Sequence, residues 1–162
     1  MTQIQQGVAD PAGTDTTPLE PSSPACVMSF NVSDPCGGSG IAADIATISS
    51  MGAHAMPVLT GVLIRDTAEI VDSHEIDPDV VVEQARVVLE DSPVNACKVG
   101  FLGSAEGVSA VAEVLADYSD VPVVSYLPNL SWLDEEQQSS YLDAFKELIL
   151  PATTLLLSLI HI

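Results

Sequence analysis

Basic residues are scarce in this sequence. Only four lysines and arginines stand against 23 acidic residues, which gives a formal net charge of −19. A chain of this charge has no basic surface with which to neutralise the phosphates of a nucleic acid or the headgroups of an anionic membrane. We therefore expect neither a nucleic-acid partner nor a membrane partner.

Aromatic residues are also few, and long apolar runs are absent. Aromatics make up 4% of the chain and apolar residues 47%, so the core must be built from Val, Leu, Ile and Ala, as in helices packed on a parallel sheet. No run approaches the ~18 apolar residues that a membrane helix requires, and no charged segment followed by an apolar one opens the chain. These features predict a cytoplasmic protein of the α/β class.

The cysteines do not suggest a disulfide or a metal centre. Cys26, Cys36 and Cys97 form no C-x-x-C pair and no metal-ligand spacing. Reduced thiols in the cytoplasm are the simplest interpretation. We expect no metal site among the residues of this chain.

The length of 162 residues fits one domain. Residues 1–24 are rich in Thr, Pro, Gln and Ser and have little to bury, so we expect a disordered tail. The domain is expected over residues 25–156. Residues 157–162 read Leu-Ser-Leu-Ile-His-Ile, which the mosaic-end adapter of transposase-made sequencing libraries would encode. We therefore expect residues 157–162 to be non-native read-through.

Apolar runs and helical patterns alternate along the domain. Strands are predicted over residues 26–32, 56–64, 94–99, 122–126 and 153–157. Helices are predicted after Gly40, after Asp77 and Ser104 as N-cap residues, and from Asp134, which opens an acidic first turn. This alternation indicates a parallel sheet with right-handed crossovers, whose ligand sites lie beyond the carboxyl ends of the strands.

A glycine-rich segment, residues 33–40 (SDPCGGSG), follows the first predicted strand. Glycines let the backbone approach a ligand closely, and N–H groups at a helix start favour an acceptor or an anion. The spacing matches neither a P-loop nor a G-x-G-x-x-G motif. On spacing alone, a plain tight turn explains the segment equally well.

Residues 33–44, SDPCGGSGIAAD, closely resemble the S/T-D-P-S-G-G-A-G-I-Q-A-D signature of hydroxymethylpyrimidine/phosphomethylpyrimidine kinases, which are members of the ribokinase-like superfamily. The similarity continues in four short segments, 50–54 (SMGAH), 65–67 (RDT), 76–78 (IDP) and 98–102 (KVGFL). The resemblance implies a ribokinase-like three-layer sandwich with a mostly parallel central sheet. It also implies a truncated fold, because kinases of this family are considerably longer.

By this resemblance, the activity is transfer of the γ-phosphoryl group of ATP, with Mg²⁺, to 4-amino-5-hydroxymethyl-2-methylpyrimidine and then to its monophosphate, in thiamine biosynthesis. The family carries its G-T-G-C/D anion hole, its catalytic base and most of its ATP site in the later half, which this sequence lacks. We therefore expect no catalytic residue in this chain, which would be the substrate-binding half and inactive alone. Relatives are commonly dimeric, so the resemblance also allows a homodimer.

The resemblance assigns substrate-binding positions to Val32, Asp34, Gly37, Gly38, Gly40, Asp44, Arg65 and Phe101. Asp44 would accept a hydrogen bond from the substrate, the backbone around Val32 and the glycines would line the pocket, and Phe101 would form an apolar wall. From its position alone, Asp44 can equally be an exposed acid early in a helix, stabilised by the macrodipole. Trp132 is expected to be a hydrophobic plug in a loop.

Three positions depart from the family pattern. Arg65 replaces a glutamine and has only donors, so it can meet a ring nitrogen but not an exocyclic amine. Val32 replaces a glycine, and Ser125 stands where relatives often have an aspartate near the phosphates and metal. These departures keep two alternatives open, a pyridoxal-type kinase and a non-catalytic module that binds a pyrimidine or thiamine precursor.

A truncated sheet also has a physical consequence. Its last strand would present an unpaired edge, and apolar surface would stay uncovered. We therefore expect marginal stability or aggregation of the 162-residue chain.

Overall fold

The computed structural model describes residues 23–158. The expected tail up to residue 22 and the expected read-through residues 159–162 lie outside the described residues.

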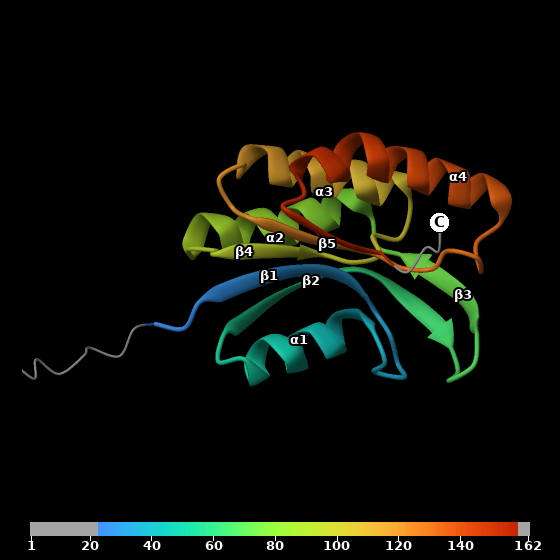
Figure 1. Ribbon diagram of the computed structural model, residues 1–162, viewed down its shortest axis with the longest axis horizontal. Coiled ribbons are helices and arrows are strands. Elements are labelled where there is room, and N and C mark those ends of the chain that lie inside the picture. Colours follow the sequence, from blue (N-terminus) through green and yellow to red (C-terminus); the bar gives the residue numbers. More distant parts are fainter. Residues whose placement is uncertain (1–22, 159–162) are drawn as a thin grey trace, which may run out of the picture.

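One sheet of six strands runs through the molecule in the order β3-β2-β1-β4-β5-β6 (Figure 1). The strands are β1 (Cys26–Ser33), β2 (His54–Arg65), β3 (Ile70–Glu75), β4 (Ala96–Val99), β5 (Val123–Leu127) and β6 (Leu155–Ser158). The helices are α1 (Gly40–Ser50), α2 (Pro78–Asp91), α3 (Ala105–Asp117) and α4 (Glu135–Ala144), the last continuing in a π-helical turn (Phe145–Ile149) and a 3₁₀ turn (Leu150–Ala152).

The prediction of a mostly parallel α/β sheet is confirmed. β1 pairs in parallel with β2 and β4, and β5 pairs in parallel with β4 and β6. The predicted strands are all present, with ends that differ by at most two residues from those expected. The helix starts are confirmed as well, since the side chains of Asp77, Ser104 and Asp134 each accept a hydrogen bond from a backbone N–H of the first turn.

One strand, β3, was not predicted. It pairs antiparallel with β2 at the edge of the sheet. Its side chains are half-buried or exposed, so it lacks the apolar run by which the other strands were identified. The connecting turn is closed by Asp66, whose Oδ1 accepts hydrogen bonds from the N–H groups of Ala68 and Glu69.

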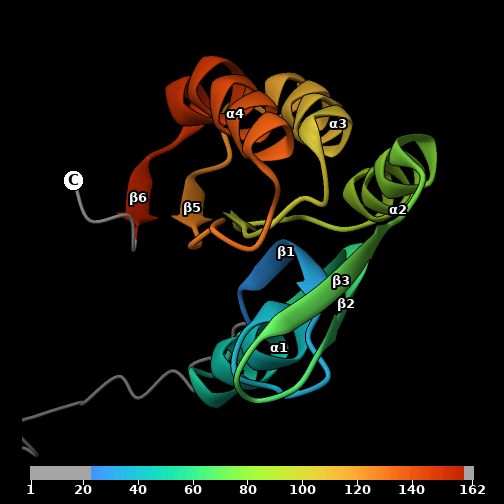
Figure 2. The same ribbon diagram turned by 90° about the vertical axis from the view of Figure 1, so that its right-hand side faces the viewer.

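The two faces of the sheet are covered unequally. Helices α2, α3 and α4 lie on one face, and α1 lies alone on the other, beneath β1 and β2 (Figure 2). The core lies under the three helices, where Phe30, Tyr141 and Phe145 are its largest fully buried side chains. Along β4 and β5 buried residues alternate with half-buried ones. The half-buried set faces the α1 side, so this side of β4 and β5 is only partly covered within residues 23–158.

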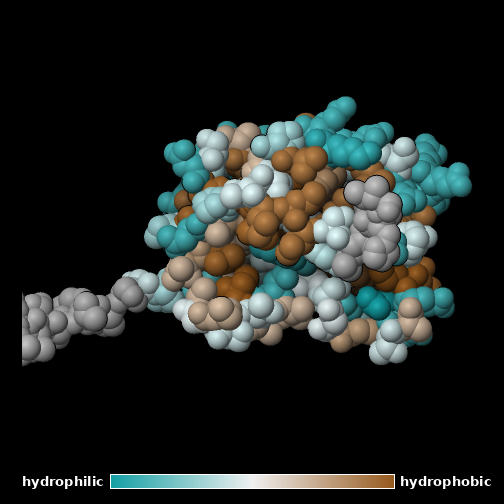
Figure 3. Space-filling view, viewed as in Figure 1, coloured by the Kyte–Doolittle hydropathy of each residue, from teal (hydrophilic) through white to brown (hydrophobic). Residues whose placement is uncertain are grey.

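Strand β6 ends the sheet and has no strand partner on its outer edge within residues 23–158. Its leucines are exposed, with 54% of Leu155 and 53% of Leu157 accessible. Apolar side chains gather on the side of the molecule that carries this strand (Figure 3). None of the helices in this part of the chain combines the length and the apolar character needed to cross a bilayer.

We expect the chain to self-associate through this edge, because an exposed, apolar edge strand pairs readily with another chain. Leu155→Lys should shift sedimentation velocity profiles toward the monomer, since a charged edge resists pairing. Val87→Lys is the matched control, because Val87 is also exposed, at 68%, but lies on α2. A monomeric wild-type chain with sharp, reversible thermal unfolding would contradict the prediction.

Candidate functional site

A cavity of about 790 Å³ lies between α1 and the partly covered side of β1, β4 and β5. Of the residues predicted to bind substrate, six line it, namely Val32, Gly38, Gly40, Asp44, Arg65 and Phe101. Asp34 and Gly37 do not line it. The glycine-rich segment, the start of α1 and the loop after β4 therefore meet at one site, as the parallel topology predicts.

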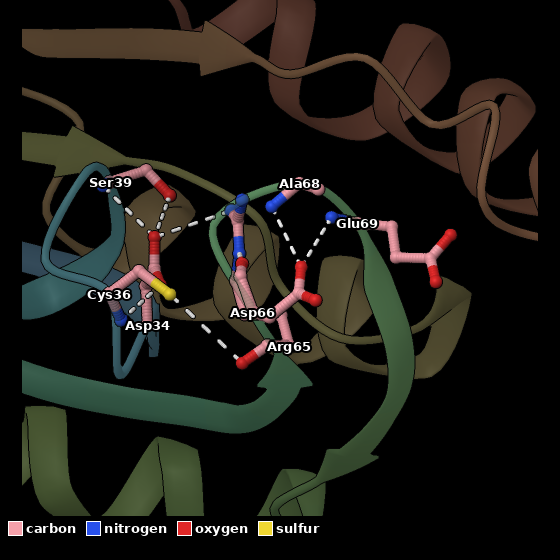
Figure 4. Close-up of polar contacts among 7 residues, drawn as sticks. All are labelled: Asp34, Cys36, Ser39, Arg65, Asp66, Ala68 and Glu69. Carbon is pink, nitrogen blue, oxygen red and sulfur yellow. Dashed lines mark hydrogen bonds and ion pairs between the residues drawn. The ribbon is translucent and has the colours of Figure 1, made fainter.

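The Asp34 side chain holds the glycine-rich segment in shape through hydrogen bonds. Its carboxylate accepts hydrogen bonds from the N–H of Cys36 at 2.9 Å and from the N–H and Oγ of Ser39 at 3.0 and 2.8 Å (Figure 4). Burial acts to raise the pKa of Asp34, but the Ser39 and Cys36 hydrogen bonds and the Arg65 charge together bring this pKa below its ordinary value. Asp34 thus shapes its own loop through these hydrogen bonds.

Gly40 is the position where the loop requires glycine. Its φ is +70°, and a Cβ there would lie 2.6 Å from the carbonyl oxygen of Val32 and 2.9 Å from the Cβ of Asp34. A side chain would therefore collide with the backbone of β1 as α1 begins. The close approach of helix start and strand end fixes this side of the cavity.

Arg65 lies at the end of β2 and reaches toward the glycine-rich segment (Figure 4). Its Nη1 lies 3.5 Å from Asp34 Oδ2, and its Nε donates to the carbonyl oxygen of Asp66 at 2.9 Å. Its Nη2 donates to no acceptor among residues 23–158. Because a guanidinium carries five donors and no acceptor, Arg65 offers the cavity hydrogen-bond donors only.

Asp44 is held in a polar network and is not the exposed acid of the alternative interpretation. Its side chain is 16% exposed. Its Oδ2 accepts hydrogen bonds from Ser29 Oγ at 2.7 Å, Asn31 Nδ2 at 2.9 Å and Lys98 Nζ at 2.8 Å. No donor among residues 23–158 binds its other oxygen, Oδ1. One carboxylate oxygen is therefore anchored by three donors, and the other is free of protein donors within residues 23–158, on a residue that lines the cavity.

Basic charge is concentrated at this site. Two of the four basic residues of the chain, Arg65 and Lys98, line the cavity. The other two, Arg86 and Lys146, pair with acids on helices at the surface. Lys98 Nζ also lies 5.8 Å from the ring centroid of Tyr126, within the range of a cation–π contact.

Phe101 and Trp132 together form an aromatic part of the cavity lining. Their ring centroids are 5.3 Å apart with the planes at 72°, an edge-to-face contact. Phe101 also packs on the buried Tyr141 at 5.1 Å. Trp132 packs against the core and at the same time lines the cavity, so the predicted plug also faces the candidate ligand space.

Ser125, which stands where relatives often have an aspartate, does not line this cavity. Ser125 is fully buried, and its Oγ lies 2.7 Å from Thr153 Oγ1. The side chains of a strand alternate between the two faces, and here the neighbouring Val124 and Tyr126 line the cavity. A carboxylate at position 125 would therefore point away from the cavity.

Sequence reasoning assigned no binding role to Ser29, Asn31 or Lys98. The available signal was the period of two along β1, because Ser29 and Asn31 alternate with buried Met28, Phe30 and Val32. Two polar residues on one face of a central strand indicate a polar cluster between that face and the helix covering it.

Cys97 of β4 is a buried thiol of the core. Burial raises its pKa to about 11. The unfolded chain ionises this thiol near pH 9, so the stability due to the neutral thiol is fully present below pH 9 and is lost as the pH rises to about 11. We expect the free energy of unfolding to fall by about 2 kcal/mol more in wild type than in Cys97→Ala over this window, measured by urea unfolding at pH 8.5 and 10.5. Parallel pH profiles of the two proteins would contradict the assignment.

Comparisons with known proteins identify a family that this sequence matches. The sequence model of the phosphomethylpyrimidine kinase family matches residues 34–157. A hydroxymethylpyrimidine/phosphomethylpyrimidine kinase of Streptomyces coelicolor is 36% identical over 139 residues, covering 86% of this chain and 52% of the relative. The enzyme of the same name from Escherichia coli is 37% identical over 91 residues, covering 56% of this chain and 34% of the relative. The chain thus spans about half, or less, of the length of these relatives.

Two solved structures share the fold. The phosphomethylpyrimidine kinase of Clostridium difficile superposes with a TM-score of 0.73 at 23% identity, covering 82% of this chain and 58% of that one. The pyridoxal kinase of Staphylococcus aureus, solved in complex with AMP-PCP and pyridoxal, gives a TM-score of 0.70 at 24% identity, covering 84% of this chain and 48% of that one. At these identities the likeness concerns the fold alone.

Proposed function

The chain belongs to the phosphomethylpyrimidine kinase family, and on this premise we propose that it is the substrate-binding half of a kinase for 4-amino-5-hydroxymethyl-2-methylpyrimidine and its monophosphate, acting with ATP in thiamine biosynthesis. The relatives named above support this activity. The observation that carries the proposal is the cavity that runs along β1, which Gly38 and Gly40 of the glycine-rich segment, Asp44 and Phe101 all line.

Each of these groups has a role in holding a small heterocycle. The open Oδ1 of Asp44 would accept a hydrogen bond from an amine or a hydroxyl group of the ligand. Phe101, with Trp132 behind its edge, would cover the face of the ring. The backbone of Gly38 and Gly40 would let the ligand approach the start of α1.

ATP would supply the phosphoryl group, and Mg²⁺ would neutralise its phosphates. Within residues 23–158 no three His, Cys, Asp or Glu side chains lie close enough to hold a metal ion, so we assign no Mg²⁺ ligand to this part of the chain. The groups that stabilise charge at the phosphates would come from the half of the domain that the relatives carry in addition. We therefore propose that this chain binds substrate but is inactive alone.

Calorimetry tests this proposal directly. The 162-residue chain should bind the hydroxymethylpyrimidine with a stoichiometry of one, and adding ATP and Mg²⁺ should release no ADP. The matched control is 2-methylpyrimidine, which lacks the groups that Asp44 and Arg65 would contact. Absence of binding at millimolar ligand would defeat the proposal, and so would equal affinity for the two ligands.

A pyridoxal-type kinase is the second candidate function, and the chemistry of Arg65 favours it. A side chain with donors only suits a ring edge that presents acceptors, such as the phenolate and aldehyde of pyridoxal. Competition between pyridoxal and the hydroxymethylpyrimidine separates the two candidates. Binding of either ligand without turnover by a kinase of full family length would instead select a non-catalytic binding module.

The setting of the protein is part of the same proposal. The cysteines at positions 26, 36 and 97 are free, which fits a reducing cytoplasm. A homodimer is proposed by analogy with the family alone.

A further inference from the structure

Asn31 of β1 has a buried side-chain amide whose oxygen and nitrogen both form hydrogen bonds. It is 4% exposed and lies on the face of the strand that carries the polar network. Its Oδ1 accepts hydrogen bonds from the N–H of Val32 at 3.0 Å and of Phe101 at 3.2 Å. Its Nδ2 donates to Asp44 Oδ2 at 2.9 Å. One amide thus joins three segments that border the cavity, the end of β1, the loop after β4 and α1.

The neighbouring backbone is adapted to this amide. The N–H of Val32 bonds the Asn31 side chain, and the β1–β2 register shifts between these two residues, where Asn31 pairs with Leu59 and Val32 with Gly61. A Cβ at position 100 would lie 2.4 Å from Asn31 Cγ, so Gly100 leaves the space that the amide fills. The strand irregularity and the glycine are both explained by the amide.

The chemistry of the partners fixes which residue can serve there. Two backbone donors face one end of the side chain and a carboxylate faces the other, so the position needs an acceptor and a donor together. Aspartate would supply the acceptor but would set a second carboxylate against Asp44. Leucine would fill the volume but leave buried N–H groups unpaired.

We propose that Asn31 is a positioning residue of the candidate site, which sets both the Phe101 wall and the orientation of the Asp44 carboxylate. The amide anchors Oδ2 of Asp44, and Oδ1 has no donor among residues 23–158. The same amide holds the Phe101 N–H, so the aromatic wall is tied to the anchored carboxylate. This inference rests on the proposed function where it concerns ligand binding, but the two bonds themselves are properties of the ligand-free chain.

The first experiment uses the ligand-free protein. Hydrogen exchange at the Phe101 amide should speed up about tenfold or more in Asn31→Ala, because the amide loses its acceptor. Ser29→Ala is the matched control, since Ser29 also donates to Asp44 but does not touch Phe101, and it should leave this exchange rate unchanged. Asn31→Asp should speed it up less than Asn31→Ala does, because the acceptor is kept. Equal exchange rates in Asn31→Ala and Ser29→Ala would overturn the proposal.

The second experiment exchanges the amide of Asn31 and the carboxylate of Asp44 between the two positions. Asn31→Asp should lower the urea midpoint and weaken binding of the hydroxymethylpyrimidine about tenfold or more, because two carboxylates then meet near one ammonium, Lys98. The double variant Asn31→Asp/Asp44→Asn restores a donor and an acceptor at unchanged net charge, so the midpoint should recover most of its loss. A double variant no more stable than Asn31→Asp would overturn the proposal.

Ligand affinity of the double variant separates the two proposals. It should stay weak, because the proposed ligand acceptor, Asp44, has become an amide. Recovery of both midpoint and affinity would uphold the role of Asn31 and refute the assignment of Asp44 as the ligand acceptor. If wild type binds no ligand while the exchange and midpoint results hold, the proposed function fails and the positioning of Asp44 and Phe101 stands.

Discussion

Replacing Gly40 with alanine is expected to lower the free energy of unfolding by about 3 kcal/mol and to abolish ligand binding. The added Cβ would lie 2.6 Å from the Val32 carbonyl oxygen and 2.9 Å from the Asp34 N. Both contacts are with backbone atoms, which cannot move aside as a flexible side chain can. The positive φ of +70° adds a cost of its own, since a residue with a Cβ is strained there.

The loop offers two matched controls for this substitution. Gly37 has a similar φ of +67° but open space around its Cβ position, so Gly37→Ala should cost only about 1 kcal/mol. Gly38 has open space and no positive φ, so Gly38→Ala should change stability by less than about 0.5 kcal/mol. Urea unfolding followed by circular dichroism would measure all three. If the three variants had equal stability, the close approach of α1 to β1 would not be what requires glycine at position 40.

Removing the Asp44 carboxylate is expected to have the second largest effect. Asp44→Ala leaves the Lys98 ammonium and the donors of Ser29 and Asn31 without their shared acceptor. The cost should be about 2 kcal/mol, below that of a fully buried pair, because both side chains keep some exposure, at 16% and 20%. Affinity for the hydroxymethylpyrimidine should fall at least about tenfold with the loss of a charge-assisted hydrogen bond.

Glu83→Ala is the control for net charge. Glu83 lies exposed on α2, and its replacement changes the charge of the chain by the same amount. It should alter neither stability nor affinity beyond experimental error. Unchanged affinity in Asp44→Ala would show that the ligand does not use this carboxylate, whatever happens to stability.

Most of the fold could be predicted because its signals are local. Helix starts depend on a cap residue and its own first turn, and Asp77, Ser104 and Asp134 all perform that role. Buried strands can be predicted from their apolar runs. β3 could not be found in this way, because it gains its structure from pairing with β2 and not from a covered face.

The candidate site was less predictable, because its geometry depends on which face of a strand a residue takes. Gly38, Gly40, Asp44 and Phe101 were located by motif, and the structure brings them to one cavity. Asn31 has no motif, and its importance comes from three partners that lie far from one another in the sequence. Ser125 was singled out from the family pattern, but its side chain lies on the face of β5 opposite the cavity. The sequence pattern alone did not show which face of the strand this side chain takes.

The placement of Arg65 and Lys98 has a kinetic consequence. A chain of net charge −19 repels a phosphate ester at long range, and only on arrival at the cavity does such a ligand meet two cations. Added salt shortens the reach of the repulsion, to about 10 Å at 0.1 M. Capture of a phosphorylated ligand would therefore accelerate with ionic strength, the reverse of what a protein with a cationic surface shows. An uncharged ligand would arrive at the same rate in dilute and in concentrated salt.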